Sequence, residues 1–299
     1  MRQTMVTSNV GKLAGNTSIA LDADYINKPK RSRDGQTLVR VRSVSRAIAI
    51  LRCFSIEQPF LSLGEIAKKA ELDAGTARRL LITLRDEGLV WQKDQKGLYC
   101  LSYRMLELTH SIPARITLQE VIGTNLLQLS KDTGMTVYLS IANETEAICL
   151  ARYLAEHAID IRWWSEGRGM PLHCGAGPKV LLAHFSEEKC RRYLSLKLSP
   201  MTTKSITDPA RLKQEIHAIR KSGYVVARDD VALGLSALGM PLLNENGEVL
   251  AAVSIAGLSP SFKDDERNRL HGILKNAIKQ MAEHVCKIKA PISADEINF

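Results

Sequence analysis

Residues 62–88, SLGEIAKKAELDAGTARRLLITLRDEG, have the pattern of two short helices joined by a tight turn. Ser62, followed three residues later by Glu65, forms a capping box, in which each side chain binds a free backbone N–H at the helix start. Asp73 is a good N-cap for the second helix. Apolar residues recur through that helix at helical spacing until Gly88 ends it. This pattern predicts a helix-turn-helix.

The outward face of the second helix has the chemistry of a base-reading surface. On a helical wheel with 3.6 residues per turn, the four apolar residues Ala77, Leu80, Leu81 and Leu84 fall on one side, which we expect to be buried. The opposite side and its flanks carry Gly75, Thr76, Arg78, Arg79 and Thr83. Arginine and threonine side chains can bind base edges in the major groove, which admits a recognition helix. We therefore expect this face to contact DNA.

The segments on either side complete a larger unit. Upstream, apolar residues at helical spacing predict another helix that contains Val44, Ala47, Ile48, Leu51 and Phe54. Downstream, residues 89–91 and 98–101 are β-prone and flank turn residues 93–97, which predicts a hairpin with lysines at its tip. Residues 39–101 are thus expected to form an α-rich winged helix-turn-helix. The alternative is a helical hairpin and a β-hairpin that merely pack together.

The distribution of charge also points to nucleic acid. The chain of 299 residues has a formal net charge of +9, from 41 Lys and Arg against 32 Asp and Glu. Residues 1–100 hold 17 of the basic and 10 of the acidic residues, so most of the excess lies with the predicted helix-turn-helix. A basic excess attracts DNA phosphates whatever the base sequence, and solubility alone would not predict this asymmetry.

Composition limits the remaining functions. The length suits about two domains, and no run approaches the roughly 20 apolar residues of a membrane span, so we expect a cytoplasmic protein. The six cysteines lack zinc-ligand spacing, and no metal or cofactor is predicted. Common phosphate-loop, dinucleotide and hydrolase motifs are missing. Asp229 and Asp230 should point apart, which favours a solvated loop over catalysis. We therefore predict that the protein is not an enzyme.

The chain divides into five expected segments. Residues 1–38 are polar and suit a disordered basic arm, residues 102–116 a linker helix, and residues 291–299 a tail. Over residues 117–290, helical patterns alternate with strands, and residues 167–171 are expected to be a loop. The predicted strands are 135–142, 147–154, 159–164, 223–227, 237–243 and 249–255. Such antiparallel strands covered by helices predict an α+β domain with a sheet face free to form a pocket.

Four stretches, in this order along the chain, resemble the IclR family of bacterial transcriptional regulators. They are VRSVSRAIAILRCFS (41–55), TARRLLITLRDEGLV (76–90), MPLHCGAGPKVLLA (170–183) and SGYVVARDDVALGLSALGMPL (222–242) with GEVLAAVSIAG (247–257). The resemblance implies a winged helix-turn-helix followed by an effector-binding α+β domain of GAF or PAS type with an antiparallel sheet. It also implies a repressor or activator that binds operator DNA as a homodimer or homotetramer.

The resemblance also implies roles for DNA-binding residues. In the family, the positions matching Thr76 and Arg79 face the major groove, and the arginine matching Arg46 contacts DNA. The helical wheel places Arg79 outward independently. The expected DNA-binding set is Arg46, Gly75, Thr76, Arg78, Arg79, Thr83, Lys93 and Lys96. Within it, Arg78 and the two lysines are assigned to phosphates on charge and position.

An effector pocket is implied between the sheet and the loop that precedes the central helix. Backbone N–H groups at a helix start bind anions, and glycines 175 and 177 let a small carboxylate approach the backbone. The expected pocket residues are Trp163, Cys174, Gly175, Ala176, Gly177, Ala227, Leu235, Ala237, Ser254 and Ala256. For His173 and Cys174 themselves, packing is favoured over chemistry, because no serine or aspartate is positioned to make them a nucleophilic couple.

Departures from the family pattern suggest the kind of effector. Relatives that bind small keto or hydroxy acids have an acidic residue at Ala227, a cysteine at Ala237 and a second serine at Ala256, so this chain keeps only Ser254 of that polar set. It adds the pair Trp163–Trp164, of which one should face the pocket or core because neighbours on a strand point opposite ways. A less polar, aromatic pocket suits a larger ligand. We expect an aromatic or otherwise bulky organic acid.

Two other classes of function remain open at this point. One is a DNA-binding protein without a ligand, in which the glycine loop and the tryptophans only pack. The other is an enzyme that uses the α+β domain. An operator affinity that changes with ligand would separate a regulator from both, because binding at two coupled sites is reciprocal.

Overall fold

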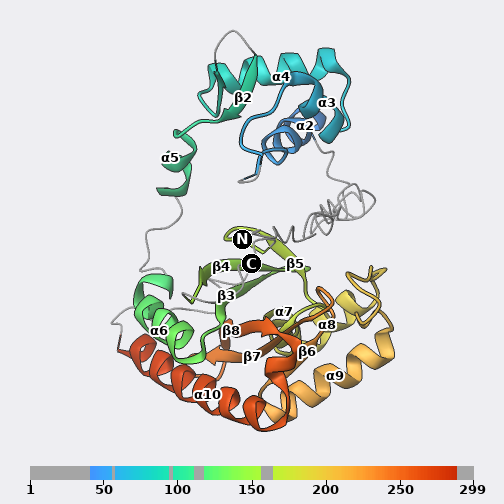
Figure 1. The fold of residues 1–299 in the computed structure, drawn as a ribbon. Helices are drawn as coiled ribbons and strands as arrows, with labels where there is room; N and C mark the ends of the chain where they lie inside the picture. The colour runs from blue at the N-terminus through green and yellow to red at the C-terminus, as the bar shows by residue number, and fades with distance from the viewer. Residues whose placement is uncertain (1–40, 56–57, 94–96, 111–117, 156–163, 288–299) are drawn as a thin grey trace, which may run out of the picture. The chain divides into compact units, whose positions relative to one another are not determined.

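The computed structural model describes residues 41–55, 58–93, 97–110, 118–155 and 164–287 (Figure 1). The chain divides into two compact units, Met1–Ala114 and Arg115–Phe299. The expected arm at 1–38, the tail at 291–299 and all but the last residue of the expected strand at 159–164 lie outside the described residues.

The first unit is a winged helix-turn-helix, as predicted. Its elements are α2 (Arg42–Leu51), α3 (Leu63–Lys69), α4 (Ala74–Asp86), β1 (Val90–Lys93), β2 (Leu98–Leu101) and α5 (Met105–His110). The capping box is present, because Ser62 N–H donates to Glu65 Oε2 over 2.8 Å and Glu65 N–H donates to Ser62 Oγ over 3.3 Å. Leu61 pairs with Tyr99 of β2, which ties the wing to the start of α3. These local signals position α4.

The second unit is an α+β fold, which confirms the predicted fold class. Its strands form one antiparallel sheet in the order β5-β4-β3-β8-β7-β6. The strands are β3 (Thr136–Asn143), β4 (Glu146–Tyr153), β5 (Gly169–Pro171), β6 (Val225–Arg228), β7 (Leu235–Leu243) and β8 (Val249–Leu258). The helices are α6 (Leu118–Thr133), α7 (Ala176–Ala183), α8 (Glu187–Leu194), α9 (Pro209–Ser222), the 3₁₀ turn η1 (Ser259–Phe262) and α10 (Asp264–Cys286).

One sequence prediction is wrong in this unit. The sequence predicts a loop over residues 167–171, but Gly169–Pro171 form β5 at the edge of the sheet. Met170 pairs with Ala147 of β4, and its side chain is buried. A three-residue strand is too short to show the alternation of apolar and polar residues on which strand prediction depends. Its partner strand, rather than its own sequence, determines its conformation.

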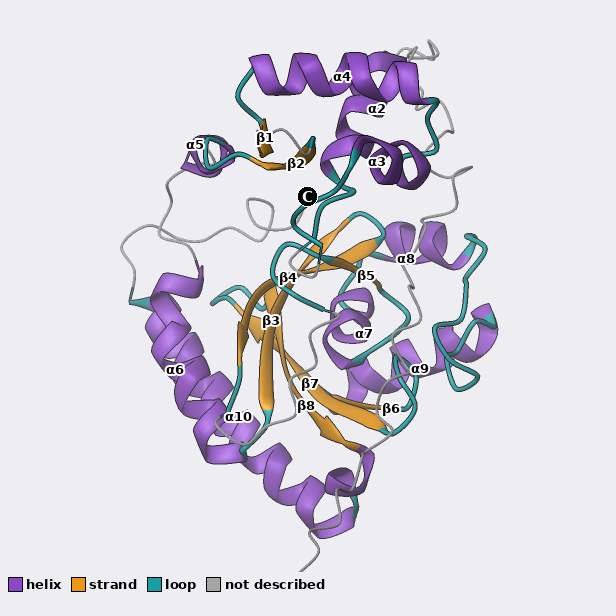
Figure 2. Ribbon diagram, turned by 45° about the horizontal axis from the view of Figure 1, so that its top comes forward, coloured by secondary structure: helices purple, strands orange, loops and turns teal. Residues whose placement is uncertain are grey.

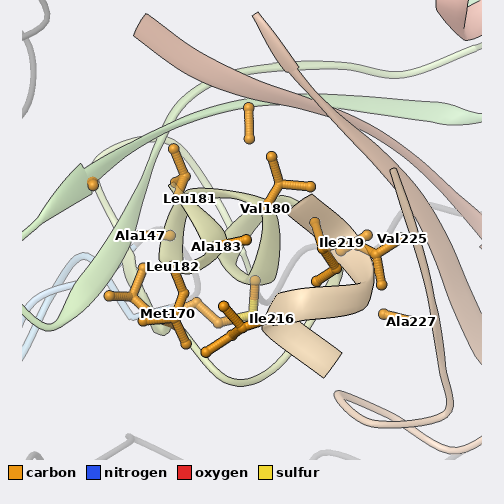
Figure 3. Packing of buried hydrophobic residues seen from close by; sticks show 14 of the residues in the cluster. Ala147, Met170, Val180, Leu181, Leu182, Ala183, Ile216, Ile219, Val225 and Ala227 are labelled. Carbon is orange, nitrogen blue, oxygen red and sulfur yellow. The ribbon is translucent and has the colours of Figure 1, made fainter. Parts of the chain in front are cut away.

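Helices cover both faces of the sheet. Helices α6 and α10 lie on one face, and α7, backed by α9, lies on the other (Figure 2). Two separate hydrophobic clusters fill these layers. In the α7 layer, Val180 lies beside Ile219 of α9, and Ala147 and Met170 line the sheet side (Figure 3). Because both faces are covered, β8 is a nearly continuous apolar run rather than an alternating one.

Helix α7 is the centre of its layer. All eight of its residues are buried, including a lysine, Lys179. Its first turn lies directly against β7, where a Cβ at Gly239 would come within 2.9 Å of the Ala176 carbonyl carbon. Gly175, which precedes the helix, has φ +82°, a conformation that L side chains rarely adopt. The two glycines therefore bring the helix N-terminus to the sheet surface.

Candidate functional site

The outward face of α4 is organised from its N-cap. Asp73 Oδ1 accepts the backbone N–H of Thr76 over 2.8 Å, and bonds from the Thr76 side chain and backbone hold the pKa of Asp73 below its usual value. The face opposite the buried residues Ala77, Leu81 and Leu84 is open. Thr76 is half-buried, and the exposed predicted residues of α4 are Gly75, Arg78, Arg79 and Thr83.

Arg79 and its two threonine neighbours form one polar strip along this face. Arg79 Nη2 lies 3.4 Å from Thr76 Oγ1, and the Thr83 hydroxyl donates to the Arg79 carbonyl over 3.2 Å. The Thr83 proton is thus occupied by the backbone, whereas the guanidinium makes no ion pair with any described residue. Arginine has five N–H donors, so Arg79 keeps most of them for another partner.

The other predicted DNA-binding residues lie outside α4. Arg46 is half-buried on α2, and Lys96 falls outside the described residues. Lys93 ends β1 and is exposed, with its Nζ 4.9 Å from the centre of the Phe60 ring. This contact supports the lysine at the base of the wing tip while leaving its charge in solvent.

The second unit contains a cavity of about 440 Å³, counting the space at its mouth. Eight of the ten predicted pocket residues line it: Gly175, Ala176, Gly177, Ala227, Leu235, Ala237, Ser254 and Ala256. Cys174 is buried but does not line it, and Trp163 lies outside the described residues. Five other lining residues were not predicted from the sequence: Tyr138, Met170, Asp230, Val231 and Ser236. Trp164, the second tryptophan of the pair, does line it.

One wall of the cavity is aromatic and another is made of alanines. The Tyr138 and Trp164 rings stack with centroids 5.1 Å apart, and Trp164 Nε1 donates to the Arg168 carbonyl over 2.9 Å. Across the sheet, Ala227 pairs with Ala237, which in turn pairs with Ala256. Short side chains in register on β6, β7 and β8 leave room in front of the rings. Tyr138 pairs with Ser254 on β8, a register that no local pattern specifies.

Asp230 corrects the expectation that residues 229–230 are a solvated loop. Asp230 is only 3 % exposed. Its Oδ2 lies 2.7 Å from Lys179 Nζ, and the Gly175 N–H donates to the carboxylate with both oxygens at 3.3 Å. The loop folds inward because the hydroxyls of Thr202 and Ser205 donate to the carbonyls of Asp229 and Asp230, each over 2.6 Å.

Asp229 has the opposite orientation, as expected for adjacent residues. Its carboxylate accepts the Gly234 N–H over 2.8 Å and the Ser259 hydroxyl over 2.7 Å, which holds its pKa below the usual value. Its φ of +56° is left-handed, a conformation that aspartate tolerates better than most residues. The two carboxylates therefore serve different contacts and do not form a catalytic pair.

Lys179 connects the cavity wall to α9. Its Nζ contacts Asp230 and both Glu215 oxygens, the latter at 3.1 and 3.2 Å. Burial would lower the pKa of Lys179, but the two carboxylates outweigh this effect and raise the pKa. The lysine is therefore a permanent cation between two carboxylates.

His173 and Cys174 are packed residues, in agreement with the favoured interpretation. The Tyr193 hydroxyl accepts the His173 backbone N–H over 3.2 Å and lies 2.8 Å from Nδ1, while Nε2 lies 3.1 Å from the Ser199 carbonyl. Because the carbonyl can only accept, Nε2 carries the proton and Tyr193 donates to Nδ1. Burial lowers the pKa of His173 and raises the pKa of Cys174 to about 11. Neither group is charged near neutral pH.

Two other kinds of site are not found in the described parts of the chain. No group of three or more His, Cys, Asp or Glu side chains is gathered there as metal ligands would be. None of the helices in those parts is long and apolar enough to cross a bilayer.

Both units match known protein families. Residues 43–94 match the family described as the IclR helix-turn-helix domain. Residues 110–285 match the family described as bacterial transcriptional regulator IclR C-terminal. The two matches follow the order of the two units along the chain.

Individual relatives cover most of the chain. The transcriptional repressor IclR of Escherichia coli K12 is 26% identical over 81% of this chain and 89% of its own length. The p-hydroxybenzoate hydroxylase transcriptional activator of Acinetobacter baylyi is 26% identical over 77% of this chain and 86% of its own. An IclR homologue from Microbacterium hydrocarbonoxydans, solved with 4-hydroxybenzoate, has the same fold, with a TM-score of 0.70 at 21% identity over 81% of this chain and 98% of its own.

Proposed function

Because the chain belongs to the IclR family of bacterial transcriptional regulators, we propose that α4 reads its operator and that the cavity beside α7 binds an aromatic acid. The protein is a ligand-responsive DNA-binding regulator and not an enzyme, as its family is. Repressors and activators both occur among its relatives. The observation that carries the proposal for the ligand is the cavity itself, which is lined by an aromatic stack and by alanines on the same face of the sheet.

The proposed DNA contacts follow from the charge and position of each side chain. Arg79 and Thr76 present donors near the N-terminal end of α4, where a recognition helix contacts base edges. Gly75 lets the groove wall approach closely. The flanking cations Arg46, Arg78, Lys93 and Lys96 are proposed to bind phosphates, which position the helix without reading sequence.

The proposed effector site combines apolar surface with a few polar groups, as ligand pockets do. The Tyr138–Trp164 stack offers a flat face for a ring, and the alanines of β6, β7 and β8 leave space for it. The ring's carboxylate would bind the N–H groups of Ala176 and Gly177, since Asp230 already occupies the Gly175 N–H. Two similar proteins support an aromatic acid, because one is named as the activator of p-hydroxybenzoate hydroxylase and the other was solved with 4-hydroxybenzoate.

A homo-oligomer in the cytoplasm completes the proposal. Val41, Val44 and Ile48 lie on one face of the α2 region and are 63, 59 and 42 % exposed. Exposed apolar side chains at this helical spacing suit contact with a second copy. Two copies would place two recognition helices on a repeated or palindromic operator.

Calorimetric titration of the full-length chain tests the effector class. Benzoate should bind more tightly than pyruvate and glyoxylate, because only the ring can fill the space before the Tyr138–Trp164 stack. Ala237→Leu, which fills the cavity, should abolish binding of benzoate. Leu233→Ala, at an exposed position that does not line the cavity, should leave it unchanged. Tighter binding of the two keto acids would contradict the proposal.

A further inference from the structure

We propose that Asp230 selects the effector, by accepting a hydrogen bond from a hydroxyl or amino group that the aromatic acid carries besides its carboxylate. This inference rests on the proposed function and specifies its ligand. It assigns a recognition role to a residue that the sequence placed in a solvated loop. It is argued from the hydrogen-bonding capacity that Asp230 and Ser254 leave unused at the cavity wall.

Asp230 has acceptor capacity to spare at the cavity wall. An ionised carboxylate has about four lone-pair positions, and the side chain is only 5 % exposed. Lys179 Nζ forms an ion pair with one of the Asp230 oxygens, Oδ2, over 2.7 Å. The other contact found within the described part of the chain is the Gly175 N–H, at 3.3 Å from each oxygen, near the upper limit for such a bond. Oδ1 therefore lacks a short partner.

Ser236 also lines the cavity, but its hydroxyl points to the other face of the sheet, because its neighbour Ala237 faces the cavity and neighbours on a strand point opposite ways. Its Oγ lies 2.9 Å from Ser259 Oγ, and the Ser259 hydroxyl donates to Asp229 Oδ1 over 2.7 Å. Since Ser259 has one proton and gives it to Asp229, Ser236 must donate its own proton to Ser259. The Ser236 hydroxyl is thus engaged with Ser259 and leaves Asp230 as the acceptor at the cavity wall.

Ser254 is the third polar side chain considered at the cavity, after Asp230 and Ser236, and it carries a hydroxyl. It is buried, lines the cavity, and makes no hydrogen bond with the described residues. A Cβ at Gly177 would lie 3.3 Å from its Oγ, so this hydroxyl is beside the first turn of α7. The donors thus gather at Ser254 and the helix start, where a carboxylate fits. The acceptor lies at Asp230, where a ligand must bring a donor.

The local charge favours the same arrangement. Lys179 balances one of the two carboxylates that contact it, which leaves one negative charge shared by Asp230 and Glu215. Glu215 is partly solvated, whereas Asp230 is enclosed. A buried acceptor left unpaired costs free energy, and a site built to hydrogen-bond a hydroxyl rejects analogues that lack it.

The test compares benzoates whose ring substituent can donate a hydrogen bond with benzoates whose substituent can only accept one. Binding to the full-length protein is measured by calorimetry. The probes are benzoate, its 2-, 3- and 4-hydroxy derivatives, and the three matching methoxy derivatives, which keep the oxygen but lose the proton. At least one hydroxybenzoate should bind about tenfold more tightly than both benzoate and its methoxy counterpart. Equal binding of hydroxy and methoxy compounds in the wild type would overturn the inference, whatever any variant does.

Two variants separate direct contact from a change in charge. Asp230→Asn should reduce the hydroxy-over-methoxy preference to within about threefold, because an amide keeps one acceptor but presents a donor in place of the second oxygen. Glu215→Gln removes the same charge from the same lysine without touching the cavity, and should keep the preference. Loss of the preference in Glu215→Gln would contradict direct recognition. If no benzoate binds at all, the proposed function fails instead.

Discussion

At the residue scale, Arg79 shows how a local contact prepares a side chain for a partner. Its guanidinium lies along α4 toward Thr76 Oγ1 rather than into an ion pair. Arg85, further along the same helix, instead lies 3.1 Å from the Asp86 carboxylate. The arginine nearer the start of the helix thus keeps its donors, while the one at its end shares them.

Arg79→Ala should weaken operator binding and relax base preference by about 1–3 kcal/mol, because a bidentate contact to a base edge is lost. Effector affinity should not change. The operator would first be selected from a random DNA pool with the wild-type protein, and binding measured by electrophoretic shift. Arg85→Ala is the matched control and should shift operator affinity little. Unchanged operator binding by Arg79→Ala would refute the assignment.

Also at this scale, Asp230 shows what can be inferred from neighbouring residues in the sequence and what depends on residues brought close by the fold. In the sequence it is one of two adjacent carboxylates, and only their opposite directions can be inferred. In the structure it is enclosed with Lys179 of α7 and accepts the N–H of Gly175, 55 residues away. Its role depends on partners that no local window contains.

At the scale of elements, α7 is held at both ends by residues of other elements. Asp230 contacts the Gly175 N–H just before it. At its other end, Arg220 of α9 donates from Nε to the Ala183 carbonyl over 2.5 Å and from Nη2 to the Phe185 carbonyl over 3.1 Å. A cation at a helix C-terminus satisfies carbonyls that have no partner inside the helix. The position of α7, which forms part of the cavity wall, therefore depends on the contacts made by both Asp230 and Arg220.

Arg220→Ala should lower the free energy of unfolding of the second unit by about 1–3 kcal/mol, since it leaves two carbonyls without their charged donor. Arg220→Lys should recover only part of the loss, because an ammonium lacks the planar fork. Urea denaturation followed by circular dichroism measures both. Arg192→Ala removes an exposed pair with Glu188 on α8, and should cost no more than about 1 kcal/mol. If the Arg220→Ala protein is no less stable than this control, the hydrogen bonds from Arg220 to the end of α7 do not stabilise the second unit.

At the scale of the whole molecule, regulation requires that the two units be coupled. A ligand can alter operator affinity only if it binds two arrangements of the protein unequally. We propose that the segment 102–116, which contains α5 and is described only as far as residue 110, transmits this difference. The recognition helix itself would then stay the same, and the spacing of two α4 helices in an oligomer would change.

Reciprocal linkage tests this coupling. If a benzoate changes the operator Kd by some factor, a saturating operator must change the Kd of that benzoate by the same factor. Both constants can be measured on the full-length protein, by fluorescence anisotropy of labelled DNA and by calorimetry. Non-specific DNA of equal length should not change ligand affinity. Ligand binding that leaves operator affinity unaltered would show that the cavity does not regulate DNA binding.

Much of the first unit could be predicted from the sequence alone. The capping box, the N-cap Asp73 and the hairpin all depend on residues within a few positions of one another. The direction of Arg79 follows from helical periodicity alone. For the same reason the bounds of β7 and β8 in the second unit are close to those expected, and the turn at 244–247 joins these two strands.

The cavity could be predicted only in part. The glycine loop and the alanines were expected to line it because the resemblance located them, and they do. Tyr138, Met170 and Val231 were missed, since their inward direction depends on strand register and on how a loop folds back. A buried aspartate could not be distinguished from a solvated one until Lys179 was placed beside it.

By itself the sequence determined that this chain has a DNA-binding winged helix and an α+β domain, because capping, periodicity and turn chemistry act over short distances. Only the tertiary structure decided which residues meet at the cavity. The sheet order β5-β4-β3-β8-β7-β6 places β3 beside β8, and so brings Tyr138 next to Ser254, far away in the sequence. Strand order and register arise from packing both faces of the sheet at once, and no single segment encodes them.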